Sequence, residues 1–276
     1  MTARRGPRSG PRNNPLARLP ELRRPVEGAL PLVPTESGLR ITELPSPNQD
    51  ERPPGVPVDT LVLHYTDMES GEAAIARLRD PEARVSSHYV VEEDGQVFRL
   101  VPEERRAFHA GLSHWRGNEL LNGRSIGIEV VNPGHSLGYR PFPALQMAAL
   151  ADLILGILER HPIPARNVVG HSDVSPDRKR DPGELFDWRG LASLGIGLWP
   201  ETLPGGTGPG DLSPVPGGME RAAELMRRIG YKVDPARPEV ALVAFQRHWR
   251  QEEWGGRADA GTLARLEAVA ALAEAG

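Results

Sequence analysis

Apolar residues fall into two kinds of segment between residues 58 and 200. Short β-branched and apolar runs predict strands, which fall at 58–64, 86–101, 125–132 and 167–171. Segments with apolar residues three and four positions apart predict helices at 70–80 and 144–161. Asp94-Gly95 interrupts the run at 86–101 and is a hairpin signal. Strands interleaved with helices indicate an α/β domain whose central sheet is covered on both faces.

The two ends of the chain differ from this middle part. Proline and arginine dominate the start, so we expect residues 1–34 to form a disordered basic tail. Glycine and proline dominate 201–213, which we interpret as a linker. Three amphipathic patterns then predict helices at 219–231, 238–253 and 259–275. The predicted domains are the α/β domain over 35–200 and a small three-helix domain over 214–276.

The composition excludes several classes of protein. A formal charge of −4 gives no general attraction to nucleic acid, and no apolar stretch approaches the length of a membrane span. The chain has no cysteine, which excludes disulfides, thiolate nucleophiles and thiolate metal ligands. Any metal ion must therefore be held by histidine and carboxylate side chains. We take a monomer as the default oligomeric state.

Three side chains near predicted strand ends form a candidate metal site. His64 ends one strand, His171 ends another, and Asp181 follows in the charged loop "GHSDVSPDRKRDPG" at 170–183. Two imidazoles and one carboxylate are a known ligand set of catalytic zinc, which keeps a fourth position open for water. Each residue alone is more often structural, so the prediction depends on the combination.

Two more charged residues support this hypothesis. Glu129 lies between apolar neighbours in "SIGIEVVN", and a buried carboxylate must be paired, ligated or functional. Lys179 precedes Asp181 by two residues, so in an extended loop both side chains point the same way. A positive charge beside a metal ligand is unfavourable unless it faces an anion, so we expect Lys179 to face an anion that forms during the reaction.

Six segments over about residues 55–200 resemble, in the same order, the motifs of the zinc N-acetylmuramoyl-L-alanine amidases. The segments are "LVLHYT", "SSHYVVEEDG", "AFHAGLSHWRG", "NGRSIGIEVVN", "GHSDVSPDRKRDPG" and "FDWRGL". The family shares a fold with phage amidases and animal peptidoglycan recognition proteins. The resemblance implies a mixed central sheet, one Zn²⁺ per chain on His64, His171 and Asp181, and a catalytic pair of Glu129 and Lys179. Glutamate at 129 resembles the bacterial members, because the recognition proteins and phage enzymes typically use tyrosine in that role.

The implied reaction is hydrolysis of the amide bond between N-acetylmuramic acid and L-alanine in peptidoglycan or muropeptides. Glu129 would transfer the proton and Lys179 would stabilise the tetrahedral oxyanion. His109 and Trp115 are predicted to line the substrate groove, with loop packing as an equal alternative. The resemblance gives His88 a supporting role rather than a ligand role. No partner is evident for the remaining histidines, which are His114, His135, His161 and His248.

The C-terminal segment is similar to the small three-helix peptidoglycan-binding domain. The similarity rests on Ala244-Phe245-Gln246 and on Asp259 with Thr262-Leu263. A purely structural appendage is the alternative.

Two other functions and two locations stay open at this point. One alternative is a recognition protein that binds muropeptides without cleaving them. The other is an unrelated zinc peptidase acting within stem peptides, although the chain has no H-E-x-x-H helix. The N-terminus shows no apolar signal region and the chain has no cysteine for a lipid anchor, so we expect a cytoplasmic location, with the periplasm as the alternative.

Overall fold

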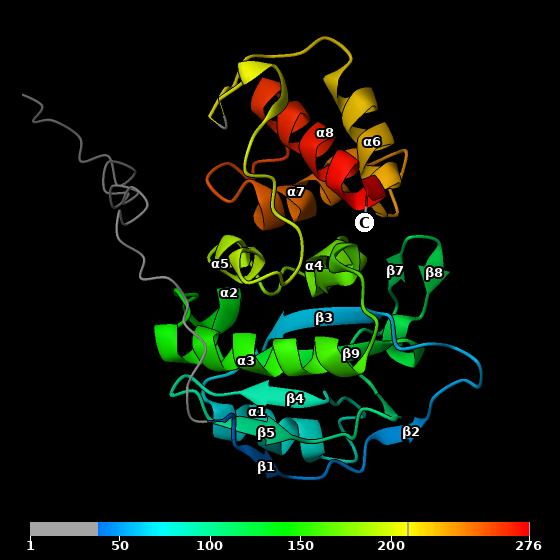
Figure 1. The fold of residues 1–276 in the computed structure, drawn as a ribbon, viewed down its shortest axis with the longest axis vertical. Helices are drawn as coiled ribbons and strands as arrows, with labels where there is room; N and C mark the ends of the chain where they lie inside the picture. The colour runs from blue at the N-terminus through cyan, green and yellow to red at the C-terminus, as the bar shows by residue number, and fades with distance from the viewer. Residues whose placement is uncertain (1–37, 209, 276) are drawn as a thin grey trace, which may run out of the picture. The chain divides into compact units, whose positions relative to one another are not determined.

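A six-stranded mixed sheet organises the structure, a computed structural model that describes residues 38–208 and 210–275 (Figure 1). The strand order is β1-β5-β4-β9-β3-β10. The strands are β1 Ile41–Glu43, β3 Thr60–Tyr65, β4 Tyr89–Val91, β5 Val97–Arg99, β9 Ser125–Val130 and β10 Val168–Gly170. The basic tail predicted over 1–34 lies outside the described residues.

The pairing of the strands confirms the predicted fold class. β4 and β5 pair antiparallel, which is the hairpin expected at Asp94-Gly95. All other neighbours in this sheet run parallel. Short strands that the sequence analysis did not predict include β1 and β2 (Gln49–Glu51), the latter paired with β6 (Arg105–Ala107). Two further short strands, β7 (His114–Trp115) and β8 (Asn118–Glu119), pair antiparallel as a hairpin.

The central strands are buried on both faces, because helices cover each side. Leu61 and Leu63 of β3 belong to the core that also contains the apolar face of α3 (Ala144–Arg160). Val62 belongs to a separate core on the opposite face. Since side chains alternate along a strand, His64 projects on the same face as Val62.

The predicted helices are also present. α1 (Gly71–Arg79) begins after Ser70, whose side chain accepts a hydrogen bond from the Ala73 N–H. α3 starts after Pro143 and ends before Pro162, which cannot continue a helix. Shorter helices are α2 Gly134–Leu137, α4 His171–Val174 and α5 Trp188–Ser193. Within residues 38–208 and 210–275, no helix combines the length and apolarity required to span a membrane.

The three C-terminal helices are α6 (Gly218–Ile229), α7 (Pro238–Trp249) and α8 (Ala260–Ala275), and we call them the helical module. Their core is continuous with one face of the sheet, because Leu225 and Phe245 belong to the same apolar cluster as Val62. The module contacts α4, which follows β10 directly. The face of the sheet that carries His64 is therefore the face that the module covers in part.

Candidate active site

Two neighbouring strands bring His64 and Glu129 to one place. β3 and β9 run parallel, and their register pairs His64 with Glu129. Paired residues of neighbouring strands project on the same face of a sheet. Both residues lie near the carboxyl ends of parallel strands, where α/β proteins form their ligand sites.

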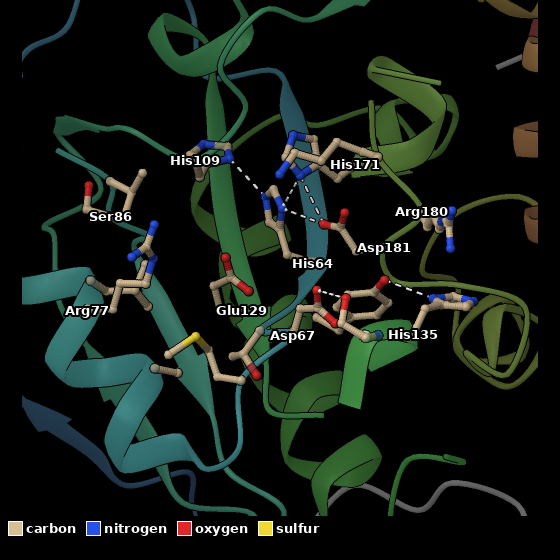
Figure 2. Close-up of a pocket in the computed structure, with 18 of the residues that line it drawn as sticks. His64, Asp67, Arg77, Ser86, His109, Glu129, His135, His171, Arg180 and Asp181 are labelled. Atoms are coloured by element: carbon tan, nitrogen blue, oxygen red, sulfur yellow. Dashed lines mark hydrogen bonds and ion pairs between the residues drawn. The ribbon is translucent and has the colours of Figure 1, made fainter. Parts of the chain in front are cut away.

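β10 and the chain that follows it supply the other two predicted ligands. His171 is the first residue of α4, directly after β10. The loop beyond α4 returns to this point, where the Ser172 N–H donates a 2.9 Å hydrogen bond to the Asp181 carbonyl. The Nδ1 atoms of His64 and His171 lie 2.9 Å apart, and each lies 3.0 Å from Asp181 Oδ2 (Figure 2). The structure thus brings the three predicted ligands together, and all three side chains are buried.

A chain of hydrogen bonds fixes the proton positions on His64. The Ser125 hydroxyl donates to the Leu121 carbonyl at 2.7 Å, so it accepts from His109 Nε2 at 3.1 Å. His109 Nδ1 is then an acceptor, and His64 Nε2 donates to it at 3.1 Å. A Cβ on Gly127 would lie 2.4 Å from the His109 ring, so glycine leaves the space that this ring fills.

His171 has the same arrangement of protons. Its Nε2 lies 3.2 Å from the Ala110 carbonyl, which can only accept, so Nε2 carries the hydrogen. When both rings are neutral, the lone pairs of their Nδ1 atoms point towards the Asp181 oxygen and towards each other. Three acceptors at such distances repel one another unless a cation lies between them. Two imidazole nitrogens and a carboxylate, each histidine held through its second nitrogen, are a donor set that fits a metal ion such as zinc.

Burial and neighbouring charges shift the pKa values of the site. Burial, aided by the nearby His171, lowers the pKa of His64 to about 4, which keeps its Nδ1 free of a proton at neutral pH. Burial alone would raise the pKa of Asp181, whereas a positive charge on the neighbouring His171 and His64 would lower it. Burial raises the pKa of Glu129 well above its ordinary value, and the Asp181 charge adds to this effect while Lys179 opposes it. Glu129 therefore takes up a proton at a higher pH than an exposed glutamate does.

A cavity of about 460 Å³ opens beside the cluster, and its lining includes His64, His171 and Asp181. Glu129 and Lys179 line the same cavity. Glu129 Oε2 is buried and has no hydrogen-bond partner within residues 38–208 and 210–275. Three guanidinium groups also border the cavity, those of Arg77, Arg178 and Arg180. Figure 2 shows Arg77 on α1 and Arg180 beyond Asp181 on opposite sides of the histidines.

Comparisons with known proteins agree with this geometry. Residues 54–184 match the N-acetylmuramoyl-L-alanine amidase family Amidase_2. The N-acetylmuramoyl-L-alanine amidase AmiD of Escherichia coli is 39% identical over 229 residues, a match that covers 77% of this chain and 82% of AmiD. The chain belongs to the N-acetylmuramoyl-L-alanine amidase family. The 1,6-anhydro-N-acetylmuramyl-L-alanine amidase AmpD of E. coli is 36% identical over 162 residues, covering 52% of this amidase and 86% of AmpD.

Solved structures show the same fold as this amidase. E. coli AmiD in complex with the substrate anhydro-N-acetylmuramic acid-L-Ala-D-γ-Glu-L-Lys superposes with a TM-score of 0.71 at 37% identity, covering 79% of this chain and 91% of the AmiD chain. AMPDH3 of Pseudomonas aeruginosa gives a TM-score of 0.65 at 33% identity, covering 77% and 91% of the two chains.

The two predicted groove residues of the amidase have different positions. His109 lines the cavity, but both of its ring nitrogens are already paired, with His64 and with Ser125. Trp115 is only 2% exposed and does not line the cavity. Its indole N–H donates to the Arg166 carbonyl, and its ring packs edge-on against Tyr231, 5.1 Å between centroids. The prediction that Trp115 lines the groove is therefore corrected, because packing beneath the helical module buries the side chain.

Several histidines of the amidase without an evident partner prove to have one. His135 lies 3.2 Å from Glu184, His161 lies 2.7 Å from Glu103, and His248 lies 2.7 Å from Asp173. His88 takes no part in the metal cluster, because its Nδ1 accepts from the Gly127 N–H and its Nε2 faces Arg52. These partners are 36 to 75 residues away in sequence, so only the fold brings them together.

Proposed function

We propose that this amidase holds one Zn²⁺ on His64, His171 and Asp181 and hydrolyses the amide bond between N-acetylmuramic acid and L-alanine in muropeptides. The observation that carries the proposal is the convergence of three acceptor atoms, 2.9–3.0 Å apart, beside a Glu129 carboxylate oxygen that has no partner within the described part of the chain. A zinc ion bound there supplies a Lewis acid that acidifies a water molecule and polarises the scissile carbonyl.

The proposal gives Glu129 the transfer of the proton in this reaction. Glu129 lines the cavity, and its buried Oε2 has no hydrogen-bond partner among the described residues, so no other side chain of this region occupies that oxygen. Its raised pKa makes the carboxylate a stronger base than an exposed glutamate. The same group, once protonated, can return the proton to the leaving amine of L-alanine. We therefore assign Glu129 the roles of general base and general acid.

The proposal gives Lys179 the role of binding the oxyanion. It lines the cavity, and its charge is close enough to oppose the rise in the Glu129 pKa. A fixed ammonium group lowers the energy of the tetrahedral intermediate more than that of the neutral carbonyl, so it accelerates the reaction. We assign Lys179 this role.

Muropeptides are substrates of suitable charge for the cavity. Arg77, Arg178 and Arg180 supply positive charge around it, and stem peptides carry carboxylates. The structure of AmiD with a bound anhydromuramyl peptide, at 37% identity, supports the same class of substrate here. The resemblance of the helical module to a peptidoglycan-binding domain stays a prediction.

Digestion of a purified muropeptide by the full-length protein, with the products identified by mass, tests the proposal. We expect free stem peptide and the intact sugar. Shortened peptides with L-alanine still attached to the sugar would indicate a peptidase, and unchanged substrate would indicate a recognition protein. A monomeric state and a cytoplasmic location stay predictions, which light scattering and cell fractionation test.

A further inference from the structure

The metal cluster depends on a very short helix. α4 comprises only His171–Val174, yet it carries the ligand His171 at its first position. Its second residue, Ser172, donates to the carbonyl of the ligand Asp181. A single helical turn has little stability of its own, because helix nucleation is unfavourable and isolated helices shorter than about 12 residues are marginal in water. The orientation of α4 must therefore come from groups that pack against it.

The third residue of α4, Asp173, connects this helix to the helical module. It is fully buried, and its carboxylate accepts three hydrogen bonds from residues that the structure describes. One comes from the Gly170 N–H at 2.7 Å, at the end of β10. The other two come from the helical module: the Tyr231 hydroxyl donates at 2.5 Å, and His248 Nδ1 lies 2.7 Å from the second oxygen. A buried carboxylate requires such donors, because an unpaired one would be strongly destabilising.

The two donors from the module are themselves held rigidly. The His248 ring is stacked between two indoles, with centroids 3.7 Å from Trp188 and 3.5 Å from Trp249. Tyr231 packs edge-on against Trp115 and lies 2% exposed. Stacked and fully buried rings have few alternative positions, so they fix the carboxylate of Asp173 rather than follow it.

The match to the amidase family ends at residue 184, before the helical module begins. Asp173 thus lies inside the matched region, whereas two of its three partners lie outside it. We infer that the helical module is a positioning element of the metal site, which holds His171 in its ligand orientation through Asp173, Tyr231 and His248. The inference rests on the proposed zinc function and adds a role for the module that does not depend on peptidoglycan binding.

Tyr231→Phe in the full-length protein tests the inference, because it removes one donor and keeps the ring packing. The matched control is Gln251→Ala, which removes another hydrogen bond between the module and the preceding chain, Gln251 Nε2–H to the Phe186 carbonyl at 2.6 Å, without touching Asp173. The zinc dissociation constant is measured by competition with a chromophoric chelator. We expect about a 10-fold weaker affinity for Tyr231→Phe, the lower end of the effect of residues that orient metal ligands, and no change for the control.

A second pair of variants separates positioning from general destabilisation. His248→Asn keeps an N–H close to the position of Nδ1, whereas His248→Leu does not. We expect His248→Asn to bind zinc more tightly than His248→Leu, and the cobalt-substituted His248→Leu protein to show an altered d–d absorption spectrum, which reports ligand geometry. Far-ultraviolet circular dichroism confirms that each variant is folded.

Equal losses of thermal stability in Tyr231→Phe, His248→Leu and Gln251→Ala, with zinc affinity and cobalt spectrum unchanged, would overturn the inference. If the unaltered protein itself fails to bind zinc in the same assay, the proposed function is wrong, and the two failures are thereby distinguished.

Discussion

Two buried clusters of this protein each combine a carboxylate with histidine, and they differ in their supply of hydrogen-bond donors. At Glu103, every contact pairs the carboxylate with a donor: Tyr89 and Arg160 donate to one oxygen, and Arg160 and His161 to the other. At Asp181, the nearest atoms are the Nδ1 atoms of His64 and His171, which carry lone pairs in the neutral rings.

The comparison shows how a structural ion cluster differs from a ligand site. The Glu103 cluster is complete as it stands, because its charges and hydrogen bonds balance within the chain. With both imidazoles neutral, the acceptors of the Asp181 cluster repel one another, and the cluster borders a cavity that Glu129 also lines. The two clusters thus differ in the number of hydrogen-bond donors around the carboxylate, more than in burial or residue type.

The largest expected effect follows from removing a ligand. His64→Ala, His171→Ala or Asp181→Ala leaves only two protein ligands, so we expect loss of bound zinc and a fall in turnover of about 10⁴-fold or more. Metal analysis of the purified variants, together with muropeptide cleavage, measures both effects. A variant that keeps one zinc per chain and ordinary turnover would contradict the ligand assignment.

Glu129→Gln changes the chemistry and leaves the ligands in place. We expect turnover to fall by about 10²- to 10⁴-fold, because glutamine cannot exchange the proton, while zinc stays bound. Steady-state kinetics and zinc content on the same preparation give the answer. Loss of zinc from this variant would mean that Glu129 is a ligand or orients one.

Lys179→Met tests the oxyanion role in the same way. We expect turnover to fall by about 10²- to 10³-fold with little change in KM, because the ammonium acts chiefly on charge that develops during the reaction. A rise in KM with unchanged turnover would instead place Lys179 in ground-state binding.

Glu103→Gln supplies the matched structural control. Burial alone would raise the pKa of Glu103, but its hydrogen bonds with Arg160, Tyr89 and His161 lower it to about 2. A lowered pKa stabilises the fold above the ordinary glutamate value and loses that effect as the pH falls from about 4.5 towards 2. We expect the variant to lose up to about 3 kcal/mol of unfolding free energy at pH 7, less at pH 3, with zinc content and turnover unchanged. Denaturant unfolding at both pH values measures this difference.

The sequence was sufficient to predict the parts of the site that sit on regular elements. His64 and Glu129 lie within strands whose alternation fixes the face on which they project. His171 and Asp181 were predicted from a strand end and from the resemblance to a family. The helix-covered sheet and the three C-terminal helices follow from hydrophobic periodicity, which is a local signal, whereas the mixed strand directions were implied by the family resemblance.

Long-range contacts leave no local pattern in the sequence. Trp115 lies in a motif that suggested a position in the substrate groove. Its ring instead packs against Tyr231, which comes more than a hundred residues later in the chain. His248 had no evident partner because Asp173 lies 75 residues before it. A spacing of this kind carries no pattern, so only the packing of the module on α4 shows that the pair exists.

We propose that amide cleavage by this protein depends on a zinc ion held by the three converging acceptors. The most direct test is to strip metal from the full-length protein with a chelator, remove the chelator, and titrate zinc back while following muropeptide cleavage. We predict that activity is absent after stripping and returns linearly until one zinc per chain has been added. Full activity in the stripped protein would contradict the account.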